Sequence, residues 1–503
     1  MNNLKKQILS VAVATSTVLS CVPVSMAAIP ADVQGTRYEE PVQILSALNI
    51  MVGDENGAYR LDDTIIRSEV AKMAIHALGL EDAAESSKGQ TMFDDVSAEH
   101  WANGYINLAV SQGIIEGDGD GNFRPNAPIS YAEAMTIMVR ATGYTVSAEE
   151  NGGYPHGYMK TGTSNGLAKN VQGSYSDKIS RGNVAYLTTN ALESKLMEQT
   201  GFGSDGKYEI TEKTLLKDKL KVTKDTGRIT AIENTSLTGS SSLAKGQIKI
   251  DNKTYETAYN MNNLLGYNVT YYVKNEGKND ESVILAMPIQ NQNNDLTISS
   301  ELFSKLTTKN GNTAIEYFKD ENTSKTNTAE ISSDATLIYN GKYQAMDKNL
   351  IDLTDKSGNI TLLDSNKNGK YDIVFVKNYE NIVVDSVSST GKIVDKYSQK
   401  VLKLDDTVDF RITKGLEEIS VSDLAEYDVL SVAASLDKEL YEVEVTNKTV
   451  EGKVTGKDSK GVLINGTKYK VAANYTDSID IGSEGVFYLS LIHISEPTRR
   501  TPI

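Results

Sequence analysis

Apolar residues in the first part of the chain recur with the spacing of a helix. Val42, Leu45 and Leu48 lie three residues apart, so they share one face of a predicted helix over residues 38–48. A second helix is expected to end at Gly79, because glycine commonly follows the last residue of a helix. We therefore predict two helices joined by a polar turn.

This pattern is repeated further along the chain. Residues 42–80 align with residues 106–144 without a gap. The identical pairs are Ile50/Ile114, Gly53/Gly117, Asp54/Asp118, Gly57/Gly121, Arg60/Arg124, Ile65/Ile129, Glu69/Glu133, Ala77/Ala141 and Gly79/Gly143. A third copy is degenerate, but residues 179–192 restore its second helix. An internal repeat of this length indicates helical units that pack on one another.

From about Thr214 the apolar positions alternate and β-branched residues become frequent. A looser repeat, an apolar strand followed by a glycine-led hairpin, predicts β modules at 205–290, 291–390 and 391–488, the last one truncated. Strands at this spacing are typical of small barrels or sandwiches. The expected fold is therefore multidomain, with an N-terminal all-α region followed by tandem all-β modules.

The two ends of the chain differ from the rest. Residues 1–27 contain Lys5 and Lys6, an apolar run and a small-residue site, which predicts a signal peptide and secretion. No later run approaches the ~20 apolar residues of a spanning helix, so no transmembrane segment is expected. Residues 489–503 resemble the translation of a sequencing adapter. We expect them to be an artefact, and the natural protein to continue differently after Tyr488.

The stretch from Phe93 to Thr142 carries several landmarks in a fixed order. It contains Phe-Asp-Asp-Val, then His-Trp-Ala, an apolar helical pattern, the turn Gly-Asp-Gly-Asp-Gly-Asn-Phe, and Ile-Ser-Tyr-Ala-Glu at the start of a second helix. This order resembles the S-layer homology (SLH) module of bacterial surface proteins. The resemblance implies three repeats, at 29–80, 90–144 and 150–200, around a pseudo-threefold axis with grooves between them.

Composition narrows the function. The formal charge of −16 argues against a nucleic-acid partner, which needs clustered basic residues. Four histidines and one tryptophan are few for general acid–base catalysis on glycans or peptides, and no common catalytic motif is present. We therefore predict a protein that is not an enzyme, although paired carboxylates stay possible.

The start of each repeat's second helix holds the candidate site residues. Ser130 and Glu133 are predicted to form a capping box, and Glu69 occupies the equivalent structural position. Arg67 and Arg181 stand at the first helical position, where we expect them to point outward beside free amides and to form an anion site. A solvated surface role is the alternative, and in either case folding should not need these arginines.

The resemblance implies a ligand for these arginines. In SLH proteins this position helps to hold a secondary cell-wall polymer whose pyruvylated sugar supplies a carboxylate. The second repeat has Tyr131 there, which could stack on a sugar but cannot pair with a carboxylate. Trp101 is a further candidate sugar platform, although a single tryptophan in a helical repeat is more often a core residue.

A possible calcium loop lies in the β region. Its residues occupy positions 1, 3, 5, 6 and 9 of such a loop and are Asp364, Asn366, Asn368, Gly369 and Asp372. Position 12, which normally supplies a bidentate Glu, is Phe375. A polar hairpin turn is the other interpretation. Apart from possible calcium, no cofactor is expected.

Together these features predict a secreted protein of the cell wall or S-layer. The SLH-like repeats would bind secondary cell-wall polymer, and the β modules would form a layer subunit or display segment with possible self-association. Two alternatives stay open. One is a wall-anchored enzyme whose catalytic module lies beyond residue 488, and the other is an adhesin that binds glycans through its β modules.

Overall fold

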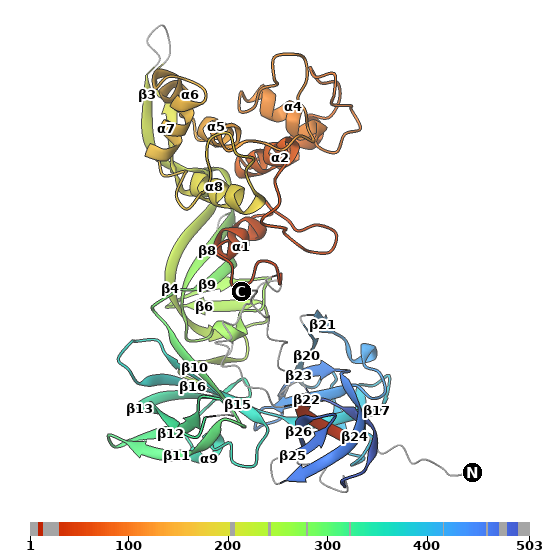
Figure 1. Ribbon diagram of the computed structural model, residues 1–503. Helices are drawn as coiled ribbons and strands as arrows, with labels where there is room; N and C mark the ends of the chain where they lie inside the picture. Colours follow the sequence, from red (N-terminus) through yellow and green to blue (C-terminus); the bar gives the residue numbers. More distant parts are fainter. Residues whose placement is uncertain are drawn as a thin grey trace, which may run out of the picture.

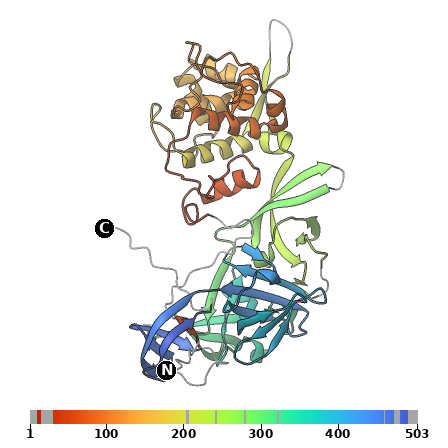
Figure 2. The same cartoon turned by 90° about the vertical axis from the view of Figure 1, so that its right-hand side faces the viewer.

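The computed structural model describes residues 9–13, 30–201, 207–239, 243–277, 280–320, 323–415, 417–458, 461–471 and 480–490. Most of the predicted signal peptide (1–27) and most of the predicted artefact (489–503) therefore lie outside the described residues. Figures 1 and 2 show helices at one end of the molecule and sheets at the other.

The helical region covers residues 30–193. Its helices are α1 (Glu39–Ala47), α2 (Arg67–Ala77), α3 (Glu81–Ser86), α4 (Asn103–Ser111), α5 (Tyr131–Ala141), α6 (Thr145–Glu150), α7 (His156–Ser164) and α8 (Arg181–Glu193). The predicted helix over 38–48 is confirmed as α1, with Val42 and Leu45 buried. The third repeat, although degenerate in sequence, also forms a helix pair, α7 and α8.

Three equivalent isoleucines join the repeats. Each lies just before the second helix of its repeat, and each is buried. The amide of Ile129 donates to the carbonyl of Ile65 at 3.1 Å, that of Ile179 to Ile129 at 3.1 Å, and that of Ile65 to Ile179 at 3.2 Å. These bonds form a closed ring, which is the pseudo-threefold arrangement that the resemblance implies.

Strands dominate after the helical region. A hairpin, β2 (Lys195–Gln199) with β3 (Tyr208–Thr214), comes before a π-helix at Leu215–Lys219. The first sheet contains β4 (Val222–Ile232), β5 (Thr235–Ser236), β6 (Gln247–Ile250), β7 (Lys253–Glu256), β8 (Asn268–Gly277) and β9 (Asp280–Pro288). Strand β8 also pairs with β4, which joins the two ends of the strand order β4-β6-β7-β9-β8.

The second sheet has the order β10-β15-β16-β13-β12-β11, with β14 paired to β13. Its elements are β10 (Asn294–Ser299), β11 (Phe303–Lys309), β12 (Asn312–Phe318), β13 (Thr326–Tyr339), β14 (Lys342–Gln344), α9 (Lys348–Ile351), β15 (Gly358–Asp364) and β16 (Tyr371–Asn378). Strands β13 and β16 pair in parallel, whereas β15 and β16 form an antiparallel hairpin.

The third sheet has the order β19-β18-β17-β22-β23-β20-β21. Its strands are β17 (Glu380–Val387), β18 (Lys392–Asp395), β19 (Val401–Lys403), β20 (Asp409–Lys414), β21 (Glu417–Ile419), β22 (Val429–Ala434) and β23 (Leu440–Thr446). A closed barrel follows, formed by β24 (Thr449–Asp458), β25 (Gly461–Ile464), β26 (Thr467–Val471), β27 (Glu484–Tyr488) and the N-terminal β1 (Leu9–Val13).

The chain is thus helical over residues 39–193 and mostly β afterwards, in several sheets and one barrel. Strand structure begins at β2, earlier than the predicted change at Thr214. The segment predicted as one module, 391–488, contributes to both the third sheet and the barrel. The hairpins of the third sheet and of the barrel look alike in sequence. What separates these two units is strand pairing between residues that lie far apart along the chain.

Neighbouring units share buried residues. The core of the helical region continues into the π-helix and the first sheet through Leu215, Leu216, Val222, Tyr272 and Leu285. The core of the first sheet in turn includes Ile338, Leu363 and Ile373 of the second sheet. These joints are packed apolar interfaces, so the helical region, the first sheet and the second sheet are held together as one body.

Replacing Ile129 with Ala should lower the free energy of unfolding by about 2 to 5 kcal/mol, because the side chain is fully buried at the junction of the repeats. Val52→Ala is the matched control, since that side chain is 47% exposed. Calorimetry or urea unfolding measures both variants. An equal effect of the two would show that the junction does not carry stability.

Candidate functional site

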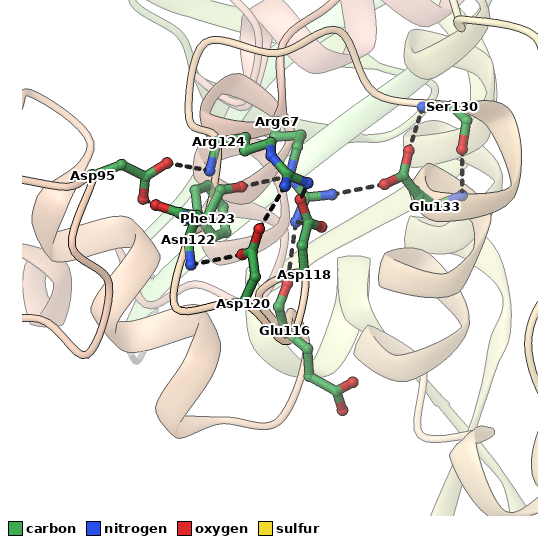
Figure 3. A network of polar contacts seen from close by, with 10 residues as sticks. All are labelled: Arg67, Asp95, Glu116, Asp118, Asp120, Asn122, Phe123, Arg124, Ser130 and Glu133. Atoms are coloured by element: carbon green, nitrogen blue, oxygen red, sulfur yellow. Dashed lines mark hydrogen bonds and ion pairs between the residues drawn. The ribbon is translucent and has the colours of Figure 1, made fainter.

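The candidate site lies where the repeats of the helical region meet, at the first turns of α2, α5 and α8. Figure 3 shows the junction around Arg67. At the start of α5, Glu133 N donates to Ser130 Oγ at 3.3 Å, and Ser130 N donates to Glu133 Oε2 at 2.7 Å. The predicted capping box is confirmed. In α2 only half of it exists, because Ile66 has no acceptor and Glu69 Oε2 alone accepts from the Ile66 amide at 3.2 Å.

Arg67 is buried, with only 6% of its surface exposed. Its Nε donates to the carbonyl of Phe123 at 2.8 Å, and its Nη2 to the carbonyl of Glu116 at 3.1 Å. Its Nη1 forms an ion pair with Glu133 Oε1 at 2.8 Å. The guanidinium also lies 5.0 Å from the centre of the Phe123 ring. The expectation that this side chain points outward is wrong.

Arg181 repeats this arrangement at the next junction. It is 8% exposed, its Nε donates to the carbonyl of Tyr59 at 2.8 Å, and its Nη1 pairs with Glu69 Oε1 at 2.6 Å. Each arginine therefore contacts the capping glutamate of a different repeat. Glu69 and Glu133 thus have two roles, since they cap their own helices and bind the arginine of a neighbour.

The amides beside these arginines are not free. Arg67 N donates to the carbonyl of Ala127 at 3.0 Å, and Ser68 N to Pro125 at 3.1 Å. At the other junction Arg181 N donates to Asp63 at 2.9 Å. The predicted anion site on free helix amides is therefore also wrong. Local sequence identifies the helix start but does not reveal that the loop of a neighbouring repeat accepts its hydrogen bonds.

The third junction has no ion pair, because both members are replaced. Tyr131 stands where the other repeats have arginine, and Asn183 stands where they have the capping glutamate. Tyr131 N donates to the carbonyl of Asp177 at 2.9 Å, as the arginine amides do at the other junctions. The ring of Tyr131 is buried, and this burial raises the pKa of its hydroxyl. Both members of the ion pair are thus replaced at the same junction. A comparison of the first helical position of one repeat with the third helical position of its neighbour would have predicted this loss of the ion pair from the sequence.

Two exposed arginines that we did not single out lie near the buried ones. Arg60 and Arg124 are equivalent positions of the first two repeats, with side chains 53% and 51% exposed. Arg124 pairs with Asp118 and, at 2.6 Å, with Asp120. Asp118 also lies 3.9 Å from Arg67 Nη2, so it connects the buried and the exposed guanidinium. The sequence does contain a signal for this pair, because both aligned positions are arginine.

An aspartate fixes the backbone at each of these exposed arginines. Asp95 accepts from the amides of Phe123 and Arg124 at 2.8 and 2.7 Å. Asp32 does the same for Tyr59 and Arg60 at 2.7 and 2.8 Å. Both arginines adopt a positive φ, near 50°. The backbones of the two turns are therefore built alike.

Trp101 lies on the surface, in the turn before α4. Its side chain is 48% exposed and stacks on His100, with ring centres 5.7 Å apart. The core role that a lone tryptophan usually has is therefore wrong here, and a flat aromatic surface is open to solvent. His100 Nδ1 accepts from the Ala102 amide at 3.1 Å, just before the start of α4.

The possible calcium loop forms the turn between β15 and β16. Asp364 accepts from the amides of Asn368 and Gly369 at 3.3 and 3.0 Å. Asp372 accepts from Ser365 and pairs with Arg228 of the first sheet at 2.9 Å. These contacts favour the polar turn. Among the described residues no group of three or more acidic, His or Cys side chains could hold a metal ion.

Within the described ranges no helix is long and apolar enough to cross a membrane.

Known proteins are similar to this chain in sequence. The model of the S-layer homology domain family matches residues 31–71 and 93–135. The middle cell wall protein of Brevibacillus brevis is 27% identical over 93% of this chain and 48% of its own length. The surface layer protein of Brevibacillus choshinensis is 26% identical over 94% of this chain and 47% of its own length. This chain thus spans about half the length of these two relatives.

Enzymes also match this chain in sequence, but over a smaller part of it. The amylopullulanase of Thermoanaerobacterium thermosulfurigenes is 32% identical over 22% of this chain and 6% of its own length. The resemblance of the first two repeats to SLH modules is confirmed by the family match. The matches over most of the chain are to surface proteins rather than enzymes.

Replacing Arg67 with Ala should destabilise the protein by about 3 kcal/mol, because it leaves Glu133 without its partner at a mostly buried junction. Arg124→Ala is the control, since exposed ion pairs contribute less than about 1 kcal/mol. The double change Arg67→Met with Glu133→Gln should recover part of the loss. Urea unfolding measures all three, and an unchanged Arg67→Ala midpoint would contradict a structural ion pair.

Acid should weaken the same junction. Burial alone would raise the pKa of Glu133, but hydrogen bonds from Ser130 and the charge of Arg67 lower it overall. A lowered folded-state pKa gives stability that is present above the unfolded value of 4.5 and is lost as the pH falls through the folded value. Glu133→Gln should therefore lose less stability between pH 7 and pH 3.5 than the parent protein. Parallel losses in the two proteins would refute this, and exposed Glu150→Gln serves as the control.

Proposed function

We propose that this chain, which carries S-layer homology repeats and is a secreted, cell-wall-associated protein, anchors itself non-covalently to the wall by binding secondary cell-wall polymer through its helical region. The family match over the first two repeats is the observation that carries the proposal. The β sheets and the barrel then form the layer or display segment. The names of two relatives that match most of this chain, a middle cell wall protein and a surface layer protein, support this role.

In this proposal the buried arginines hold the repeats together rather than extend toward the polymer. Arg67 and Arg181 are held by carbonyls and glutamates on several sides, so a polymer carboxylate reaches them only at the edge of the guanidinium. Tyr131 has the corresponding place at the third junction. In this proposal all three contribute to the polymer site mainly by fixing how the repeats face one another.

Exposed groups make the first contacts with the polymer. Trp101 offers a flat ring to the C–H face of a sugar. Arg124 and Arg60 offer guanidinium groups, which suit the carboxylate of a pyruvylated sugar because a guanidinium can donate two parallel hydrogen bonds. Asp118 and Asp120 compete for Arg124, so an anionic polymer must displace them.

Self-association through the β region is part of the proposal. A layer subunit needs a rigid connection between its wall anchor and its assembling part, and the shared cores described above supply one. A wall-anchored enzyme is the second candidate. The partial match to an amylopullulanase supports it, because an enzyme carries a segment similar to part of this chain.

The test is binding of the full chain to isolated cell-wall sacculi, before and after the secondary polymer is removed. The chain should bind the intact sacculi and fail on the stripped ones. Trp101→Ala and the double change Arg60→Ala/Arg124→Ala should each weaken binding by roughly tenfold, which corresponds to about 1.4 kcal/mol. Exposed Met92→Ala is the control.

Two results would count against the anchor as described. Equal binding to stripped sacculi would shift the ligand to peptidoglycan itself. Unchanged binding in the Trp101 variant and in the Arg60/Arg124 variant, with unfolding midpoints at the parent value, would remove these exposed groups from the mechanism.

A further inference from the structure

A cleft of about 350 Å³ lies where the first, second and third sheets meet. Its walls come from the β4–β5 turn and the short 3₁₀ helix at Asn262–Leu264 in the first sheet unit, from β10, β15 and β16, and from β23. The volume falls at the lower end of the ~300–1,000 Å³ typical of small-molecule sites. This cleft is separate from the helical region, so its role is independent of wall anchoring.

Strand alternation decides which side chains enter the cleft. On the β15–β16 hairpin, Asn359 pairs with Lys377 and Thr361 with Phe375. The intervening Ile360 and Val376 belong to the core of the second sheet, so the paired residues face the opposite way, toward the cleft. The cleft-facing side of the second sheet therefore carries a lysine, an amide, a hydroxyl and an aromatic ring.

Strand β23 faces these groups with carboxylates. Leu440, Glu442 and Glu444 line the cleft, whereas the alternate residues Val443 and Val445 are buried in the core of the third sheet. These two carboxylates stand on successive cleft-facing positions of one strand, whose core contacts lie on its other face. The two carboxylates make the cleft negatively charged.

The charges in the cleft sum to an excess of one negative charge. Lys377 Nζ lies 2.9 Å from Glu442 Oε2 and 3.8 Å from Glu444 Oε1, and the hydroxyl of Tyr379 donates to Glu444 at 3.0 Å. Glu442 raises the pKa of Lys377, and Lys377 lowers the pKa of Glu442, so this pair stays ionised. An anionic ligand would meet an unfavourable potential here.

Uncharged polar groups surround this centre. The side-chain amides of Asn234, Asn262, Asn263 and Asn359 line the cleft, and none of them makes a hydrogen bond to another residue in the described ranges. Each amide offers two donors and an acceptor. Ile338, Phe375 and Leu440 provide an apolar wall next to them.

We propose that this cleft binds a neutral or amino-bearing saccharide. Such a ligand presents hydroxyl groups at its edge, which suit unused amides and carboxylates, and a C–H face, which suits an apolar wall that includes an aromatic ring. An acidic sugar is disfavoured by the two glutamates. Lys377 keeps Glu442 ionised, so this carboxylate does not supply the protonated acid that glycoside hydrolysis needs.

The test is calorimetric titration of the full chain with three probes, namely N,N′-diacetylchitobiose, glucosamine and glucuronate. The first two should bind, and glucuronate should bind at least tenfold more weakly. Asn359→Ala and Glu442→Gln should each weaken binding of the first two probes at least fivefold, with the larger effect of Glu442→Gln on cationic glucosamine. Glu418→Gln is the matched control, because this carboxylate is 65% exposed in the same sheet and lies outside the cleft.

Several outcomes would overturn the proposal. They are no binding of either non-acidic probe at millimolar concentration, tighter binding of glucuronate than of the other two, and binding that Trp101→Ala abolishes while the cleft variants leave it unchanged. Competition by a short neutral peptide for the same site would identify a peptide cleft instead. If Glu442→Gln lowers the melting temperature, exposed Asn263→Ala replaces it, and full affinity in that variant and in Asn359→Ala would also contradict the site.

Discussion

The ring of backbone hydrogen bonds among Ile65, Ile129 and Ile179 is the constraint on which the helical region depends. It places the start of each second helix against a loop of the neighbouring repeat, and that loop accepts the first helical amides. Helix starts elsewhere rely on side chains of their own segment or on water. Here no repeat is complete alone, because part of its capping comes from the next one. The buried arginines follow from the same geometry, since they extend from these helix starts into the adjacent repeat.

The sequence predicts what is local in this arrangement. The helix pairs, the capping box of Ser130 and Glu133, and the change from helix to strand all follow from spacing and residue type within a short window. The burial of Arg67 does not, because its own helix gives no sign of the Phe123 and Glu116 carbonyls that surround it. Trp101 shows the opposite case, since its size favours a core position but the turn before α4 leaves it half exposed.

The β region shows the same limit. Strands and hairpin turns are visible as alternation and Asn- or Gly-rich turns, and the turn at Asp364–Asp372 closes the β15–β16 hairpin. The grouping of strands into sheets is not visible, because β4 pairs with β8 and β17 with β22 across long stretches of chain. The cleft between the sheets could not be foreseen either. Its residues come from three sheets, and only the packing of those sheets brings Lys377 and Glu442 together.

The residues at the first and third helical positions of neighbouring repeats form a single unit that the two repeats share. A double-mutant cycle at the neutral junction tests this most directly, with Tyr131→Arg, Asn183→Glu and both changes together, each measured by urea unfolding at pH 7. We predict that Tyr131→Arg alone destabilises the protein, because it adds an unpaired charge at a buried position. The double change should then recover a coupling free energy of about 1 kcal/mol or more. Additive effects of the two changes would contradict the account.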